Sequence, residues 1–200
     1  MVVLRDAAPW SPTIANQHYL ESLVDKGLLP KITDPDNPEW IAPPRSHQVP
    51  ALPSGYVVSL ARLHERGFGS PPGRFIRELC QHYGVELHNF APNAISQAAT
   101  FVGVCEGFLG IPVHWELWLF LFRAKLHTVF ESNGVRRLVR AGSLMLQVRE
   151  GRKEHYISST MASNNRDWDR GWFYLRNDGD LLLVSHPEIV GFQDVIRKNN

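Results

Sequence analysis

The sequence predicts an α+β fold, in which a layer of about five helices precedes a small antiparallel sheet of two hairpins. Two observations favour this class. Up to about residue 127, apolar residues recur at the three- to four-residue spacing of amphipathic helices; beyond residue 135 they alternate with polar residues, as in strands. This change of period divides the chain into a helical part, residues 14–127, and a sheet part, residues 136–185.

The length of 200 residues suits one domain with its own core. We expect a flexible segment at residues 1–13, a single domain at 14–185, and a tail or short helix at 186–200. A net charge of +1 excludes a global attraction to polyanions. Two Cys fit no disulfide framework, and the longest apolar run is too short to cross a bilayer. We therefore expect an intracellular protein, cytoplasmic or nuclear, with no membrane partner.

The first helix is predicted within residues 14–27, where apolar residues share one face and a glycine ends the segment. Seven prolines follow between Pro30 and Pro53. Proline fixes φ and removes a hydrogen-bond donor, so this stretch forms neither a long helix nor a central strand. We interpret it as an extended strap fixed by Trp40, although its composition equally allows a disordered linker.

Four more helices are predicted from their capping residues and apolar spacing, at residues 55–66, 71–83, 92–109 and 114–125. The last is apolar nearly all round, which indicates that it is covered on most sides or forms an interface. Its candidate interface residues are Trp115, Trp118, Phe120 and Phe122.

The sheet is predicted from two hairpins. Residues 144–149 alternate and can turn at 150–153 into residues 154–160. Residues 172–184 contain two strands around Asn177, Asp178 and Gly179, a sequence typical of a tight turn with positive φ.

The candidate catalytic and metal-binding groups are scattered along the predicted elements. Cys80 and His82 are two residues apart on a helix and point in different directions, which disfavours a zinc site with His88. Cys105, beside Glu106 and ahead of His114, lies on an apolar stripe, so we interpret it as a core residue rather than a nucleophile. We expect no catalytic residues, no bound metal and no cofactor.

One part of the chain is strongly basic. Residues 120–155 contain eight Lys and Arg against three Glu, a local charge of +5. Basic groups near the aromatic residues 172–174 suit single-stranded RNA or DNA, through phosphate contacts and base stacking. Charges that protect strand edges from aggregation are an equally good explanation. The candidate nucleic-acid-binding residues are Arg136, Arg137, Arg140, Arg149, Arg152 and Lys153.

Residues 55–122 also contain a series of short motifs: "HERGF", "YG", "PN" and "CEGFLG", followed by a histidine and paired Leu–Trp and Leu–Phe. With "WFYLRN" further on, this series resembles the plant gypsy-type transposon domain, found in proteins of LTR retrotransposons. The residues that carry the resemblance, which we expect to be structural, are His64, Gly67, Phe68, Tyr83, Gly84, Pro92, Asn93, Cys105, Glu106, Gly110, His114, Trp172, Phe173 and Tyr174.

The resemblance implies a retrotransposon-derived protein in a Gag-like position and supplies no catalytic residues. The leading hypothesis is therefore a non-enzymatic structural or interaction domain that associates with itself or with other proteins encoded by the element. The alternative is a module that binds single-stranded nucleic acid through the basic sheet. A metal-dependent nuclease or transposase is a third hypothesis, disfavoured because its acids do not follow the usual order of strands and helices.

Overall fold

The computed structural model of the chain describes residues 9–70, 72–130, 134, 136–156 and 167–177. Its α-helices are α1 (Gln17–Asp25), α2 (Ala61–His64), α3 (Arg74–Tyr83), α4 (Pro92–Val102) and α5 (Trp115–Leu121). Its strands are β1 (Trp40–Ile41), β2 (Tyr56–Leu60), β3 (Phe122–Leu126), β4 (Thr128–Phe130), β5 (Arg136–Leu138), β6 (Leu144–Val148) and β7 (Trp172–Arg176). A π-helical segment, Gly103–Phe108, continues α4, and single 3-10 turns cover Leu87–Asn89, Lys153–His155 and Trp168–Arg170.

The fold is a mixture of helices and small antiparallel sheets, as an α+β class requires. In the described residues the strands form a three-stranded sheet, in the order β1-β7-β2, and two two-stranded sheets, β3–β6 and β4–β5. The expected order of a helical layer followed by two hairpins is not what the strands show. β1 and β2 precede most of the helices along the chain, and both pair with β7 from its far end.

Two predicted helices contain strands. Residues 56–60 are β2, and only residues 61–64 are helical, because the tyrosine and two valines at 56–58 pack well on a pleated, buried surface. The helix predicted at 114–125 ends at Leu121, and β3 follows at once, with Phe122 and Ala124 buried and Lys125 exposed. The short alternation in 122–126 decided that local structure, rather than the apolar run before it.

Three other helices lie where their end signals predict them. α1 begins after Asn16, whose side chain accepts a hydrogen bond from the backbone of Tyr19. α3 ends at Gly84, which has a left-handed φ of 59°. α4 begins with Pro92 at its first position.

The predicted hairpins are only partly described. β6 confirms the strand predicted at 144–149, but its partner is β3 and not residues 154–160. β7 confirms the strand at 172–176. Residues 157–160, the segment 178–185 and the predicted tail at 186–200 lie outside the described residues.

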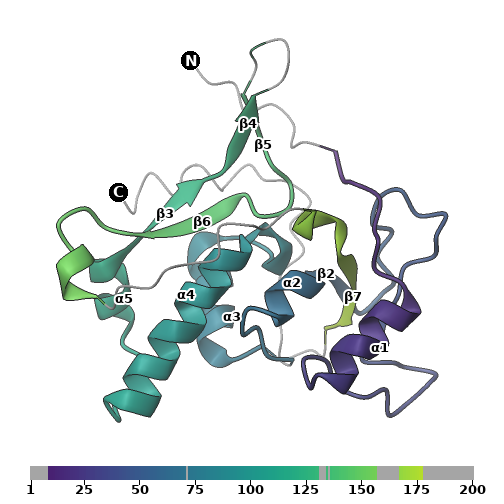
Figure 1. Ribbon diagram of the computed structural model, residues 1–200, viewed down its shortest axis with the longest axis horizontal. Coiled ribbons are helices and arrows are strands. Elements are labelled where there is room, and N and C mark those ends of the chain that lie inside the picture. The colour runs from purple at the N-terminus through teal and green to yellow at the C-terminus, as the bar shows by residue number, and fades with distance from the viewer. Residues whose placement is uncertain (1–8, 71, 131–133, 135, 157–166, 178–200) are drawn as a thin grey trace.

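Figure 1 shows how these elements are arranged. The β3–β6 ribbon crosses over α4, while β4 and β5 extend it away from the helices. The sheet of β2 and β7 lies on the other side of α2, near α1. One continuous buried core joins these parts, from Leu20 and Leu23 of α1 to Leu144 and Leu146 of β6.

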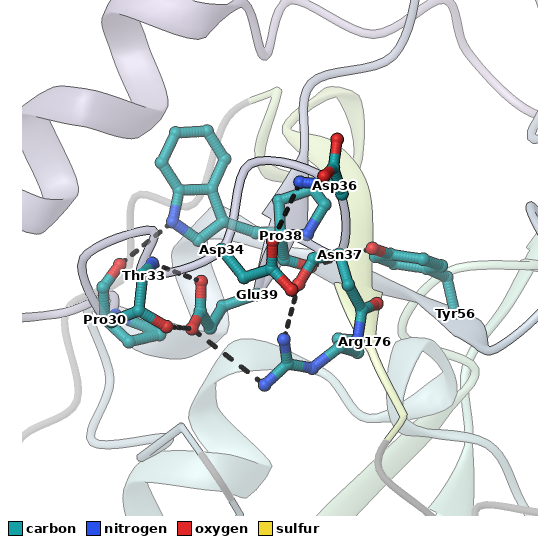
Figure 2. Close-up of polar contacts among 10 residues, drawn as sticks. Pro30, Thr33, Asp34, Asp36, Asn37, Pro38, Glu39, Tyr56 and Arg176 are labelled. Carbon is teal, nitrogen blue, oxygen red and sulfur yellow. Dashed lines mark hydrogen bonds and ion pairs between the residues drawn. The ribbon is translucent and has the colours of Figure 1, made fainter.

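The strap predicted between Pro30 and Pro53 is confirmed. Trp40 within it is 2% exposed, and its indole N–H donates a hydrogen bond to the carbonyl of Pro30 at 3.0 Å. The Glu39 carboxylate accepts hydrogen bonds from the hydroxyl and the backbone N–H of Thr33, at 2.5 and 3.1 Å (Figure 2). The strap therefore stabilises its own bend before it pairs with the sheet.

A second group of contacts attaches the strap to the end of the three-stranded sheet. The Arg176 guanidinium donates to the carbonyl of Asn37 at 2.5 Å and lies 3.9 Å from the Glu39 carboxylate (Figure 2). The Tyr56 hydroxyl donates to the carbonyl of Pro38 at 2.8 Å. Side chains from β2 and β7 thus satisfy backbone carbonyls of a segment whose prolines cannot form a regular ladder.

His64, at the end of α2, is a buried polar group that links several elements. Its Nε2 lies 2.9 Å from the hydroxyl of Ser59 in β2, and its ring packs against Phe68 and Phe173. Burial lowers the pKa of His64 to about 3, so the ring is neutral in the folded protein at neutral pH. A hydrogen bond with the backbone of Leu28 opposes that shift and joins the loop after α1 to the same group.

Gly67 brings the turn after α2 against α4. Its φ is +95°, and a Cβ at this position would lie 2.9 Å from the Cβ of Ala99. Both the backbone conformation and the close approach therefore require glycine.

We predict that Gly67→Ala destabilises the protein by about 1–3 kcal/mol, the usual cost of a residue forced into a sparsely populated conformation. Gly55→Ala is the matched control, because Gly55 has a φ of +81° and open space around it. Urea unfolding should show a larger loss of stability at Gly67, and a double-mutant cycle with Ala99→Gly should be non-additive. Equal destabilisation at the two glycines would show that the approach to Ala99 costs nothing.

We also predict a pH dependence from His64. Its folded-state pKa lies below the ordinary value of about 6.5, so the unfolded chain takes up this proton first as the pH falls. The stability is complete above pH 6.5 and declines toward pH 3, by up to about 1.4 kcal/mol per pH unit. In urea unfolding at pH 7 and pH 5, His64→Gln should lose this share of the pH dependence, whereas His18→Gln, at an exposed position, should keep it. The same dependence in both variants would contradict the assignment.

Candidate interaction surfaces

The polar groups inside the apolar segment 92–122 are not gathered around one point. Cys105 is 1% exposed and belongs to the core, whereas Glu106 and His114 are exposed. His114 is the N-cap residue of α5 and makes no side-chain capping bond. Across the described ranges, no three His, Cys, Asp or Glu side chains lie close enough together to hold a metal ion.

The two thiols are both buried and unpaired by a disulfide. Burial, with a smaller contribution from the charge of Glu86, raises the pKa of Cys80 to about 12. That thiol is protonated at neutral pH and is a poor nucleophile. Cys105 lies near Tyr156, whose pKa is raised by burial and, less strongly, by Cys105.

The residues that carry the family resemblance occupy structural positions. Phe68, Tyr83, Trp172, Phe173 and Tyr174 are buried, which removes the aromatic run 172–174 from any solvent-facing platform. The Tyr174 hydroxyl accepts a hydrogen bond from the backbone of Ala51 at 3.0 Å and so holds the strap. Asn93 lies in the first turn of α4, and Gly110, with a φ of +64°, follows the π-helical segment.

The aromatic face of α5 is narrower than the sequence predicts. Trp118 and Phe122 are fully buried and stack on one another with ring centroids 4.1 Å apart. Trp118 also contacts Phe75 and Phe101, at 5.1 and 5.2 Å. These two candidate interface residues are therefore core residues, because helices α3 and α4 cover the side of α5 that bears them.

The other two aromatic residues of α5 differ in their exposure. Trp115 is partly buried against Phe75 and His82, with ring centroids 5.7 and 4.7 Å apart. Phe120 is 45% exposed, and the guanidinium of Arg152 lies 4.0 Å from its ring centroid. Of the four candidates, Phe120 offers the most surface to a partner.

The most exposed apolar residues lie just before α5. We call residues 107–113 the apolar tip. Phe108 is 90% exposed, Leu109 57% and Ile111 41%, and the intervening Gly110 and Pro112 are exposed as well. Contiguous apolar surface of this kind marks a contact site for another molecule.

The π-helical segment explains how the apolar tip becomes exposed. The helical spacing of α4 predicts that Leu109 lies on the buried stripe with Cys105. In the π-helical turn each bond spans five residues, so the 3.6-residue period is broken and the next apolar residues leave the buried face. Cys105 stays in the core and Leu109 does not.

The second candidate surface is a β-ribbon, which we call the basic arm: residues 122–130 and 136–148. Its base is β3 paired with β6, from Phe122 opposite Val148 to Leu126 opposite Leu144. Its outer part is β4 paired with β5, where Val129 lies opposite Arg137 and Phe130 opposite Arg136. One face of the base packs on the core through buried Ala124, Leu144 and Leu146.

The candidate basic residues are used in different ways. The Arg149 side chain donates a hydrogen bond to the carbonyl of Leu119 at 2.8 Å, near the end of α5, and Arg152 covers Phe120. Arg140 is partly buried, and Lys153 is exposed on a 3-10 turn beyond the arm. Arg136 and Arg137 belong to β5.

The residues predicted from sequence omit several that the structure brings to both surfaces. Phe108 and Ile111 could have been found from the glycines and proline around them, since an apolar run interrupted by Gly110 and Pro112 cannot continue a helix. Arg123 and Lys125 were assigned to a helix, although the two-residue alternation of 122–126 indicates a strand.

Within the described residues, no helix has both the length and the apolar character to cross a membrane.

Comparison with known proteins identifies one family. Residues 57–126, about a third of the chain, match the family model described as "Putative gypsy type transposon". The matched segment begins in β2, ends with β3, and includes α2 to α5 with the apolar tip. Neither the curated proteins nor the solved structures contain a match. The resemblance seen in the sequence is thus confirmed, and residues 57–126 of this chain are a gypsy-type transposon domain.

Proposed function

We propose that the chain is a non-enzymatic interaction domain of a transposon-related protein, with a Gag-like structural role that includes self-association. The family match supplies the transposon relationship. The chemistry of the described residues supports a binding role, because both thiols are buried and His64 is held neutral in the core.

The observation that carries self-association is the exposure of the apolar tip. Phe108, Leu109 and Ile111 present adjacent apolar side chains to solvent. Removing such surface from water is favourable by roughly 25 cal/mol per Å², and a second copy of the chain offers the same surface in return. Phe120, on the helix that follows, is the one residue of the four aromatic candidates with substantial exposure.

We expect sedimentation velocity to show reversible association of the chain at micromolar concentration. Phe108→Ser with Leu109→Ser should weaken it about tenfold or more, since truncating a central aromatic anchor commonly costs ~2 kcal/mol. Val49→Ser with Leu52→Ser is the matched control, because these strap residues are also 55% and 44% exposed. A chain that stays monomeric contradicts self-association, and equal weakening by both pairs removes the apolar tip as its site.

The absence of catalysis is a separate prediction. Labelled DNA and RNA should remain intact with the chain in Mg²⁺ or Mn²⁺, because a metal-dependent nuclease needs carboxylates that share the ions. In the strap, Asp34 accepts a hydrogen bond from the backbone of Asp36 at 3.0 Å, which is ordinary turn chemistry. Metal-dependent cleavage that disappears in Asp34→Asn with Asp36→Asn would overturn the non-enzymatic proposal.

A second candidate function is nucleic-acid binding through the basic arm. Arg123 and Lys125 occupy alternate positions of β3, on the face opposite to buried Phe122 and Ala124. A basic surface in a chain of net charge +1 localises phosphate contacts to one part of the molecule. This function is compatible with a Gag-like role and uses a different surface from the apolar tip.

A further inference from the structure

The form of the basic arm specifies the kind of nucleic acid that it fits. Pairing runs from Phe122 opposite Val148 to Phe130 opposite Arg136. Between the two ladders, the backbone of His127 bonds to Ser143 at 2.7 Å and to Val139 at 3.2 Å. One residue on the first strand is thus opposite five on the second, a bulge that bends the ribbon without ending it.

The outer part of the basic arm is open on both faces. Val129 and Phe130 are successive residues of a strand and point to opposite faces, and they are 38% and 72% exposed. Figure 1 shows β4 and β5 extending away from the helices. The nine residues 122–130 span about 30 Å at the usual rise of a strand. The body of the protein therefore leaves both faces of this part accessible to a partner.

The charge of the basic arm favours a polyanion. Residues 122–149 contain six Lys and Arg and one acidic residue, Glu131, so their net charge is +5 in a chain of net charge +1. The six are Arg123, Lys125, Arg136, Arg137, Arg140 and Arg149. Neutralising phosphates with such groups releases counterions and drives binding without requiring a particular sequence.

The base of the basic arm lacks a stacking platform for single strands. The residues of β3 and β6 that face away from the core are Arg123, Lys125, Met145 and Gln147, and none of these is aromatic. The aromatic residues 172–174, which the sequence suggested for stacking, are buried in the three-stranded sheet. Single-strand binding modules rely on exposed aromatic faces beside basic groups.

We infer that the basic arm binds double-stranded DNA by lying in the major groove, with its basic residues on the flanking phosphates. A B-form major groove about 12 Å wide admits a two-stranded ribbon, whereas the major groove of an A-form RNA duplex is too deep and narrow for side chains to read. The inference rests on the second proposed function and adds the class of nucleic acid.

The test compares a 20-base-pair DNA duplex with its single strand and with the RNA duplex of the same sequence, by fluorescence anisotropy at low salt. We expect the DNA duplex to bind at least tenfold more tightly than the other two. Lys125→Ala, Arg136→Ala and Arg137→Ala together should weaken duplex binding tenfold or more. They should also lower the salt slope by about 0.9 for each phosphate that the arm no longer neutralises.

The matched control is Lys26→Ala, Lys31→Ala and Arg74→Ala, which removes the same charge at exposed positions away from the arm. It should bind like the unchanged chain, and thermal melting should show that both variants fold. Equal or tighter binding of the single strand would overturn the duplex inference but leave nucleic-acid binding in place. Equal weakening by both triple variants would remove the arm as the site, and no binding at low salt would overturn both proposals.

Discussion

The insertion of β7 between β1 and β2 is the constraint on which the rest of the described structure depends. Tyr174 and Leu175 of β7 pair with Ile41 and Trp40 on one side and with Val58 and Val57 on the other. These strands are far apart in sequence, so the pairing closes long loops before it gains contacts. It fixes the proline-rich strap and buries the aromatic run 172–174. It also provides Phe173, against which the neutral ring of His64 packs.

From this sheet the core continues through His64 and Gly67 into the helices. The close approach of Gly67 to Ala99 brings α2 against α4, and α4 lies under β6. Trp118, Phe101 and Phe75 then fill the space between α3, α4 and α5. The aromatic residues that make the middle of the sequence so apolar are mostly consumed by this packing. What remains for partners lies at two extremities, the apolar tip and the basic arm.

The two surfaces have opposite chemistry and lie on consecutive parts of the chain. The apolar tip comes just before α5, and the basic arm begins directly after it. Arg149 and Arg152 connect them, since the first bonds to the carbonyl of Leu119 and the second covers the Phe120 ring. A Gag-like protein needs contacts with its own copies and with nucleic acid, and these surfaces would serve the two needs separately. The family match covers the tip and the first strand of the arm.

The sequence by itself determined the features that depend on local chemistry. Gly84 and Pro92 set the limits of helices, the prolines excluded a helix from the strap, and motifs identified the family. Only the tertiary structure decided which strands pair, because β2 and β7 are separated by more than a hundred residues and no local signal specifies their register. It also decided which apolar residues are exposed. Trp118 and Phe108 are equally apolar in sequence, but neighbouring helices bury the first, and a π-helical turn exposes the second.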